Sequence, residues 1–158
     1  MINCIKMFVN LYVISSYKNS EISAKFYRSF ILIPFYNMWS VYLISTINEK
    51  KTYVGTTNDT IKRLQKHNTN KGAKSTKGYE WKYVLTINGF TSRSIACSFE
   101  SYYKQIRYTR NRSAGNLIKN RIVDLALLFK NGCYDNIDIC FADDKYKNTY
   151  LSAIKDGY

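Results

Sequence analysis

The fold is decided by the stretch from Ser40 to Asn68, SVYLISTINEKKTYVGTTNDTIKRLQKHN. Its first half contains two short apolar, β-prone runs, residues 40–44 and residues 52–56, with the polar residues 48–51 between them. Two such runs around a polar turn are typical of a β-hairpin. We therefore expect the domain to be built around a hairpin that begins near Ser40.

The second half of this stretch predicts an amphipathic helix over residues 58–68. Either Asn58 or Asp59 can cap its N-terminus, because a short polar side chain there accepts a bond from a backbone N–H of the first turn. Ile61 and Leu64 then provide an apolar face that packs on the rest of the domain.

Polar side chains gather at one corner of the predicted hairpin and helix. Arg63 and His67 lie four residues apart and therefore share a stripe beside the apolar face of the helix. Tyr42 and Tyr53 come from the two strands, and His67 is the only histidine of the chain. These four side chains make up a candidate functional site.

The composition indicates a globular and strongly basic protein. The chain has 158 residues, of which 46% are hydrophobic and 22% charged, which is enough to build one domain with a core and excludes a disordered chain. Its formal net charge of +13 favours a polyanionic partner, nucleic acid before an anionic membrane surface, although A+T-rich coding also enriches lysine. No stretch approaches the roughly 18 apolar residues of a membrane span.

The cysteines indicate neither a metal module nor a disulfide framework. Cys4, Cys97, Cys133 and Cys140 form no CxxC pair, and one histidine cannot complete a Cys/His zinc module. We expect free thiols in a reducing, intracellular compartment, with nucleus and cytoplasm not distinguished.

The middle of the chain predicts a basic loop and a third strand. Residues 69–78 contain three lysines and two glycines, a composition that suits a flexible loop whose N–H and ammonium groups approach phosphates. A solvated lysine loop without function is the alternative. Residues 81–87 alternate apolar and polar side chains and are expected to form the third strand.

A second helix follows residues 91–92, which supply its cap. Its apolar side consists of Ile95, Ala96, Phe99, Tyr103 and Ile106. Glu100 stands at the edge of this apolar side. A carboxylate there is either a boundary residue that contacts solvent or lysine, or a group directed into a site.

The chain divides into three parts. Residues 38–130 form the predicted domain, which ends with a third helix from about residue 113 to residue 130. Gly132 is expected to stop this helix. Residues 131–158 form a C-terminal tail with a short strand over 137–141. Residues 1–37 are expected to be an N-terminal extension and not a targeting signal. Three interpretations of it stay open: a packed extra element, a flexible segment, or sequence upstream of the natural start.

An ordered set of residues resembles the signature of the GIY-YIG nucleases, in particular their small, Slx-type, single-domain branch. Ser40-Val41-Tyr42 resembles the first half of the signature, and Tyr53-Val54-Gly55, with its tyrosine eleven positions after Tyr42, resembles the second. Arg63, His67 and Glu100 follow in the order of the family. The chain departs from the pattern at Ser40, where the motif has glycine, and it lacks the Cys/His set of the C-terminal zinc module of Slx-type proteins.

The resemblance implies an α/β (α+β) fold, a small three-stranded antiparallel sheet flanked by helices. It also implies divalent-metal-dependent hydrolysis of DNA phosphodiester bonds, with Glu100 as the ligand of one Mg²⁺ (or Mn²⁺). Flapped or branched DNA in repair, recombination or replication is the expected substrate. The A+T-rich composition, apart from the resemblance, suggests a large DNA virus or another A+T-rich genome as the origin. A protein partner and the oligomeric state stay open.

The same resemblance assigns roles to the candidate residues. Tyr42 would accept the proton of the attacking water, Tyr53 would bind water or phosphate, and His67 would position or share the proton. Arg63 would bind phosphate oxygens, and Gly55 would permit close packing below the site. The basic residues expected to bind DNA are Lys62, Lys66, Lys71, Lys74, Lys77 and Arg93.

Two other functions compete with the nuclease. A catalytically inactive, basic nucleic-acid-binding module of the same fold would keep the charge but lose site residues, and none of the five at the site is lost here. A basic peripheral membrane protein would need an amphipathic helix for which only residues 1–37 leave room, so no membrane partner is expected.

Overall fold

The computed structural model describes residues 38–108, 115–131 and 136–155. The strands and helices in chain order are β1 (Trp39–Thr46), β2 (Thr52–Thr57), α1 (Thr60–Asn68), β3 (Trp81–Phe90), α2 (Arg93–Gln105), α3 (Leu117–Asn131), β4 (Asp138–Phe141) and α4 (Asp144–Lys155). Short 3₁₀ helices cover Lys74–Thr76 and Ile106–Tyr108. The predicted extension over residues 1–37 lies outside the described residues.

The sheet has four antiparallel strands in the order β2-β1-β3-β4, so the prediction of three strands was wrong. The hairpin of β1 and β2 and the third strand are where the sequence predicted them. The short run in the C-terminal tail becomes β4, which pairs with Leu85–Asn88 of β3. Its partner lies about fifty residues earlier, and no local pattern encodes a pairing over that distance.

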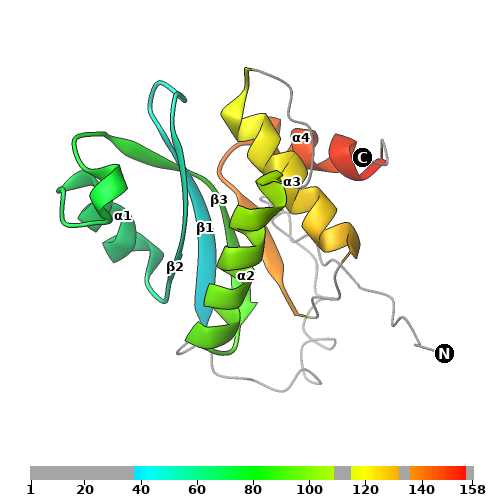
Figure 1. The fold of residues 1–158 in the computed structure, drawn as a ribbon, viewed down its shortest axis with the longest axis horizontal. Coiled ribbons are helices and arrows are strands. Elements are labelled where there is room, and N and C mark those ends of the chain that lie inside the picture. The colour runs from blue at the N-terminus through cyan, green and yellow to red at the C-terminus, as the bar shows by residue number, and fades with distance from the viewer. Residues whose placement is uncertain (1–37, 109–114, 132–135, 156–158) are drawn as a thin grey trace, which may run out of the picture.

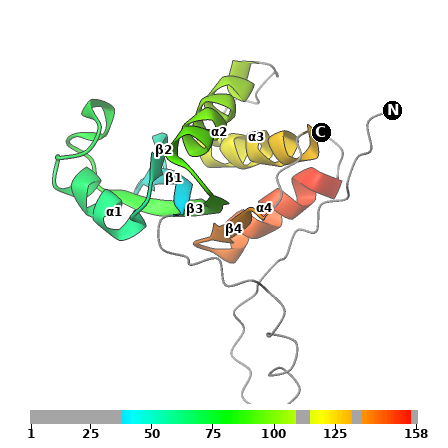
Figure 2. The ribbon, with the colours of Figure 1, turned by 90° about the horizontal axis from the view of Figure 1, so that it is seen from below.

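The two faces of the sheet carry different sets of side chains. Val41 and Leu43 of β1 face the main core, which α2, α3 and α4 complete. Tyr42 and Ile44, in the alternate positions, face the opposite side and pack with Trp81 near α1. Figures 1 and 2 show α2 and α3 together across the strands, and α1 and α4 at opposite sides of the molecule.

The helix caps confirm the predicted starts of α1 and α2. Asp59, one of the two predicted caps, accepts a bond from the Lys62 backbone N–H, and the Ser92 hydroxyl accepts from that of Ile95. The predicted apolar faces were wrong at their margins, because Ile61 is 72% exposed and Ile95 is 53% exposed. Neither helix is covered by a neighbour at these positions.

The C-terminal residues form more than a tail. Helix α4 packs on α3 and buries Tyr146, Tyr150 and Ala153, which recur on one helical face. It was not predicted, because tyrosines rather than aliphatic residues make up that face. The predicted third helix begins at Leu117, and both its expected start and Gly132 lie outside the described residues.

Glu49, in the turn between β1 and β2, contacts residues of both β3 and α4. Its Oε1 accepts bonds from Lys82 Nζ and Lys145 Nζ, both at 3.2 Å, and from the Tyr146 hydroxyl at 3.0 Å. These cations, Lys145 first, lower the pKa of the Glu49 carboxyl. The hairpin is thereby held against β3 and α4.

Two further expectations have a partial outcome. Cys97 and Cys140 are free and exposed, as expected for scattered thiols, whereas Cys4 and Cys133 lie outside the described residues. Within the described residues, no helix is long and apolar enough to cross a membrane.

Candidate active site

The candidate site is a cleft of about 1020 Å³ beside the edge strand β2, which lies between α1 and α2 (Figure 1). Its lining comes from the start of β1, from β2, from the beginning of α1 and from one side of α2. The lining residues are Trp39, Tyr53, Thr56, Thr57, Asn58, Asp59, Lys62, Arg63, Lys66, Arg93, Cys97 and Glu100. Three of the predicted site residues, Tyr53, Arg63 and Glu100, therefore line one cleft. Three of the predicted basic residues, Lys62, Lys66 and Arg93, line it with them.

Tyr42 stands behind the cleft and connects two of the predicted residues. Its hydroxyl lies 2.8 Å from His67 Nε2 and accepts a hydrogen bond of 2.7 Å from Arg63 Nε. The Tyr42 and His67 side chains have no exposed surface. Strand β1 and helix α1 thus bring together three residues that are 25 positions apart at most.

The hydrogen bonds around His67 define its tautomer. Its Nδ1 lies 2.8 Å from the Thr76 hydroxyl, which itself donates to the Ala73 carbonyl at 2.7 Å. Thr76 has therefore used its proton and accepts one from Nδ1, which leaves Nε2 as the acceptor for the Tyr42 hydroxyl. The 69–78 stretch, expected to be a flexible loop, contains a 3₁₀ helix here and buries Thr76.

Burial keeps both members of this pair neutral at pH 7. Burial, and secondarily the nearby Arg63 charge, lowers the pKa of His67 to about 4. Burial raises the pKa of the Tyr42 hydroxyl above its usual value, and the Arg63 hydrogen bond only partly opposes this. Tyr42 is therefore a neutral donor to a neutral imidazole.

Two glycines make room for this arrangement. A Cβ on Gly55 would lie 2.4 Å from the Tyr42 hydroxyl oxygen and 2.8 Å from Tyr53 Cε1. A Cβ on Gly72 would lie 2.6 Å from His67 Nδ1. All three distances are far below van der Waals contact, so a side chain at either position displaces a residue of the site. The close packing expected at Gly55 is present.

Glu100 approaches the cleft from the other face of the sheet. Its carboxylate accepts a short hydrogen bond from the Thr56 hydroxyl of β2 and forms an ion pair with Lys104, one turn further along α2. Lys104 Nζ also lies 5.6 Å from the centre of the Tyr53 ring. Glu100 is partly buried and lines the cleft, as a group directed into a site would, and it also makes the lysine contact expected of a boundary residue.

Comparison with known proteins identifies the family. The family model described as the GIY-YIG catalytic domain matches residues 38–115. A UPF0213 protein of Vibrio campbellii is 38% identical over 72 residues, which cover 46% of this chain and 68% of that protein. This chain belongs to the GIY-YIG family.

Two other relatives extend the comparison. An uncharacterized protein of Acanthamoeba polyphaga mimivirus is 39% identical over 97 residues, covering 59% of this chain and 58% of the viral protein. The structure-specific endonuclease subunit SLX1 of Vanderwaltozyma polyspora is 28% identical over 115 residues, covering 62% of this chain but 36% of that subunit. The chain thus spans somewhat over half of the mimivirus relative and about a third of the subunit.

The donor set fits the divalent metal that GIY-YIG nucleases generally use. Among the described residues there is no group of three or more His, Cys, Asp or Glu side chains that would enclose a metal ion. A single carboxylate, Glu100, beside an open polar cleft suits an ion such as Mg²⁺, which keeps several waters and takes its remaining ligands from a phosphate. Glu100 is the residue that would hold the ion.

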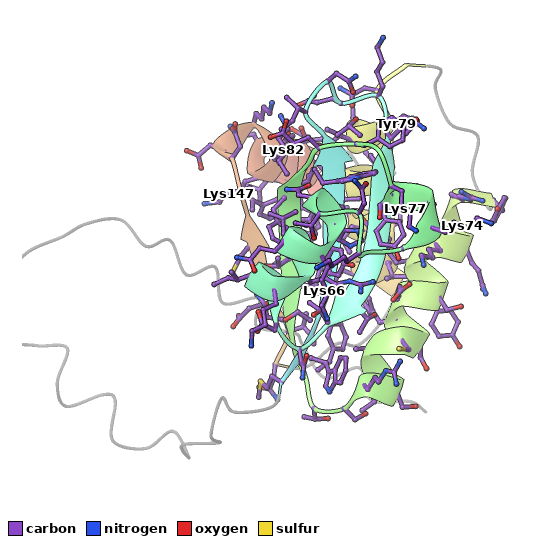
Figure 3. All side chains as sticks on the ribbon, turned by 90° about the vertical axis from the view of Figure 1, so that its left-hand side faces the viewer. Lys66, Lys74, Lys77, Tyr79, Lys82 and Lys147 are labelled. Atoms are coloured by element: carbon purple, nitrogen blue, oxygen red, sulfur yellow. The ribbon has the colours of Figure 1, made fainter. Side chains whose placement is uncertain are left out.

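The predicted DNA-binding residues fall into two groups. Lys62, Lys66 and Arg93 line the cleft, on α1 and at the start of α2. Lys71, Lys74 and Lys77 are exposed in the segment after α1 and lie outside the cleft lining. Figure 3 looks onto α1 and this segment, with Lys66, Lys74 and Lys77 on the same face of the GIY-YIG domain.

Several residues of the site were not identified from the sequence. Thr76 and Gly72 support His67, Thr56 binds Glu100, and Trp39 lines the cleft. A threonine within a lysine-rich loop carries no local signal of burial. Trp39 was the one detectable case, because an aromatic residue directly before a signature strand is a candidate for contact with a base.

Proposed function

We propose that this protein is a divalent-metal-dependent endonuclease that hydrolyses phosphodiester bonds of flapped or branched DNA. The observation that carries the proposal is the hydrogen-bonded set of Tyr42, His67 and Arg63, of which Arg63 lines one basic cleft together with the Glu100 carboxylate. The name of the SLX1 relatives, structure-specific endonuclease subunits, supports the choice of substrate.

Arg63 would bind the scissile phosphate and open the proton path. Its Nε now donates to the Tyr42 oxygen, while the side chain lines the cleft. A phosphate in the cleft attracts the planar guanidinium, which binds phosphate oxygens in a forked arrangement. When the guanidinium turns to the phosphate, the lone pair that it covered on Tyr42 becomes available to a water molecule.

Tyr42 and His67 would then move the proton. As the water oxygen attacks phosphorus, one water proton passes to the Tyr42 oxygen, and the Tyr42 proton passes to His67 Nε2. The bond from phosphorus to the leaving oxygen breaks, and that oxygen takes a proton from solvent. Burial is the main cause of the low pKa of His67, and the Arg63 charge is the second. Phosphate near Arg63 would offset this second cause and make the imidazole a better acceptor.

Tyr53 and Glu100 complete the proposed machinery. Tyr53 lines the cleft, unlike Tyr42, and would bind the water or a phosphate oxygen. Glu100 would hold the metal, which supplies charge neutralisation to the developing phosphorane when bound. The Thr56 hydroxyl keeps the Glu100 carboxylate oriented toward the cleft.

A cleavage assay tests the proposal. Purified protein with Mg²⁺ or Mn²⁺ is incubated with end-labelled flap, fork, four-way junction, duplex and single-stranded DNA. Glu100→Ala should abolish cleavage without unfolding, whereas Glu80→Ala, which removes an exposed carboxylate outside the cleft lining, should cleave like the unchanged protein. Inactivity on every substrate with both metals, with salt-sensitive DNA binding retained, would favour a binding module instead.

A further inference from the structure

Trp39 is the only aromatic side chain besides Tyr53 among the residues that line the cleft. It is the first residue of β1, and an irregularity in the pairing of β1 with β3 lies between Trp39 and Ser40. Such irregularities re-aim the side chain beside them. The indole is half-buried: it packs against the main core on one side and borders the cleft on the other.

A cation lies over this indole. The guanidinium carbon of Arg93, the first residue of α2, is 5.8 Å from the centre of the Trp39 ring. Arg93 is exposed and also lines the cleft. Cys97 and Glu100, four and seven positions further along α2, line it as well. An aromatic face and an arginine plane at the rim of a phosphate-binding cleft are the elements that bind an unstacked base in single-stranded nucleic acid.

We propose that Trp39 and Arg93 form a stacking site for an unpaired base of the DNA, beside the phosphate held at Arg63 and Glu100. This assignment rests on the proposed nuclease function and narrows its substrate to DNA with an unpaired nucleotide next to the cleaved bond. A base within a continuous duplex is paired and stacked on both sides, so it reaches Trp39 only after extrusion. A flap or a branch point supplies a free base without that cost.

Stacking depends on an aromatic face, whereas simple phosphate binding depends on charge, so the two roles can be separated. The lysines of the cleft attract any polyanion and do not distinguish paired from unpaired DNA. Stacking depends on the aromatic face, so removal of that face should weaken binding of unpaired DNA and leave duplex binding as it is. A purely structural role, in which Trp39 only covers the core, predicts no such difference.

The test compares Trp39→Leu with Trp39→Phe in the full chain. Leucine keeps an apolar side chain against the core but cannot stack, whereas phenylalanine keeps a smaller aromatic face. Binding is measured by fluorescence anisotropy without divalent metal, on a flap DNA and a duplex of equal length. A flap with 2-aminopurine at its first unpaired position reports stacking directly. Thermal unfolding shows whether each variant is folded.

We expect Trp39→Leu to weaken flap binding about 5- to 100-fold, the range of base–aromatic stacking, with duplex binding changed less than threefold. Trp39→Phe should retain most of the flap preference, and the 2-aminopurine quenching of the unchanged protein should be lost only with leucine. Tyr102→Leu is the matched control, since Tyr102 is 61% exposed on α2 and does not line the cleft.

An equal loss on flap and duplex, or an unchanged flap preference in Trp39→Leu, would overturn the stacking site. Equal binding of flap and duplex DNA by the protein without substitutions would overturn the stacking site as well. These outcomes are distinct from failure of the nuclease proposal, which is absence of cleavage in the presence of metal while the metal-free binding data stand.

Discussion

The neutral state of His67 gives the folded protein a pH dependence that can be measured without DNA. Burial and the nearby Arg63 lower the pKa of His67 to about 4 in the folded state. The imidazole of the unfolded chain has a pKa of about 6.5. Because the folded pKa is the lower one, the unfolded chain binds the extra proton between these values, and stability is lost as pH falls through that window.

The magnitude follows from the two pKa values. At pH 7.5 both states are neutral, whereas at pH 5 the unfolded imidazole is almost fully protonated and the folded one remains mostly neutral. Proton linkage then predicts that the free energy of unfolding is about 2 kcal/mol lower at pH 5 than at pH 7.5 because of this residue. His67 is the only histidine of the chain, so no second imidazole contributes.

Urea unfolding at pH 7.5, 6.5, 5.5 and 5.0 measures this loss, with His67→Gln as the reference. The glutamine does not titrate, and the carboxylates that begin to titrate near pH 5 are common to both proteins and cancel in the difference. A proton NMR titration of the imidazole gives the folded pKa independently. Two results would refute the idea that His67 is a buried, neutral acceptor next to Tyr42. One is that the protein without substitutions loses no more stability than His67→Gln as the pH falls, and the other is that the imidazole titrates near 6.5.

Three substitutions test the rest of the site. Gly55→Ala places a Cβ 2.4 Å from the Tyr42 oxygen, so we expect it to lower the free energy of unfolding by about 1–3 kcal/mol and cleavage at least tenfold; chemical denaturation that shows full stability would contradict the packing. Arg63→Lys keeps the charge but loses the forked guanidinium and the bond to Tyr42, so single-turnover cleavage should fall by about tenfold or more while the anisotropy Kd for DNA changes less than threefold; wild-type cleavage by the lysine variant would argue against a specific guanidinium role. Glu100→Gln keeps the side-chain size and an acceptor for Thr56, so its thermal unfolding should stay within a few degrees while metal-activated cleavage drops by about a hundredfold; cleavage with the same rate and the same Mg²⁺ dependence as the unchanged protein would show that the carboxylate is not the principal ligand.

The parts of the fold with strong local signals were predictable from the sequence. The polar turn between two β-prone runs gave the hairpin, and the caps at Asp59 and Ser92 gave the starts of α1 and α2. The elements that carry Tyr42, Arg63 and Glu100 were predictable for the same reason, whereas the roles assigned to these residues stay predictions. The hairpin and the two helices largely determine where Tyr42, Arg63 and Glu100 lie.

The parts that depend on distant contacts were not predictable. The pairing of β3 with β4 and the packing of α4 on α3 join segments whose local sequences do not refer to one another. The burial of Tyr42 was equally hidden, because a strand tyrosine is compatible with either an exposed or an internal position. Thr76 reaches His67 only because the lysine-rich segment folds back on α1.

The edge position of β2 explains why this small domain can combine the two halves of its site. Along β2, Tyr53 and Gly55 share a face with Tyr42, whereas Thr56, the residue after Gly55, points to the opposite face and binds Glu100 of α2. In an inner strand, neighbouring strands on both sides would separate the proton-handling groups from the carboxylate. At the edge, both faces border the same cleft, so a phosphate beside β2 can meet Arg63 from α1 and the Glu100 side from α2. The alternation of β2 therefore has the hydrogen-bonded Arg63 and Tyr42 on one face and the Glu100–Lys104 ion pair on the other.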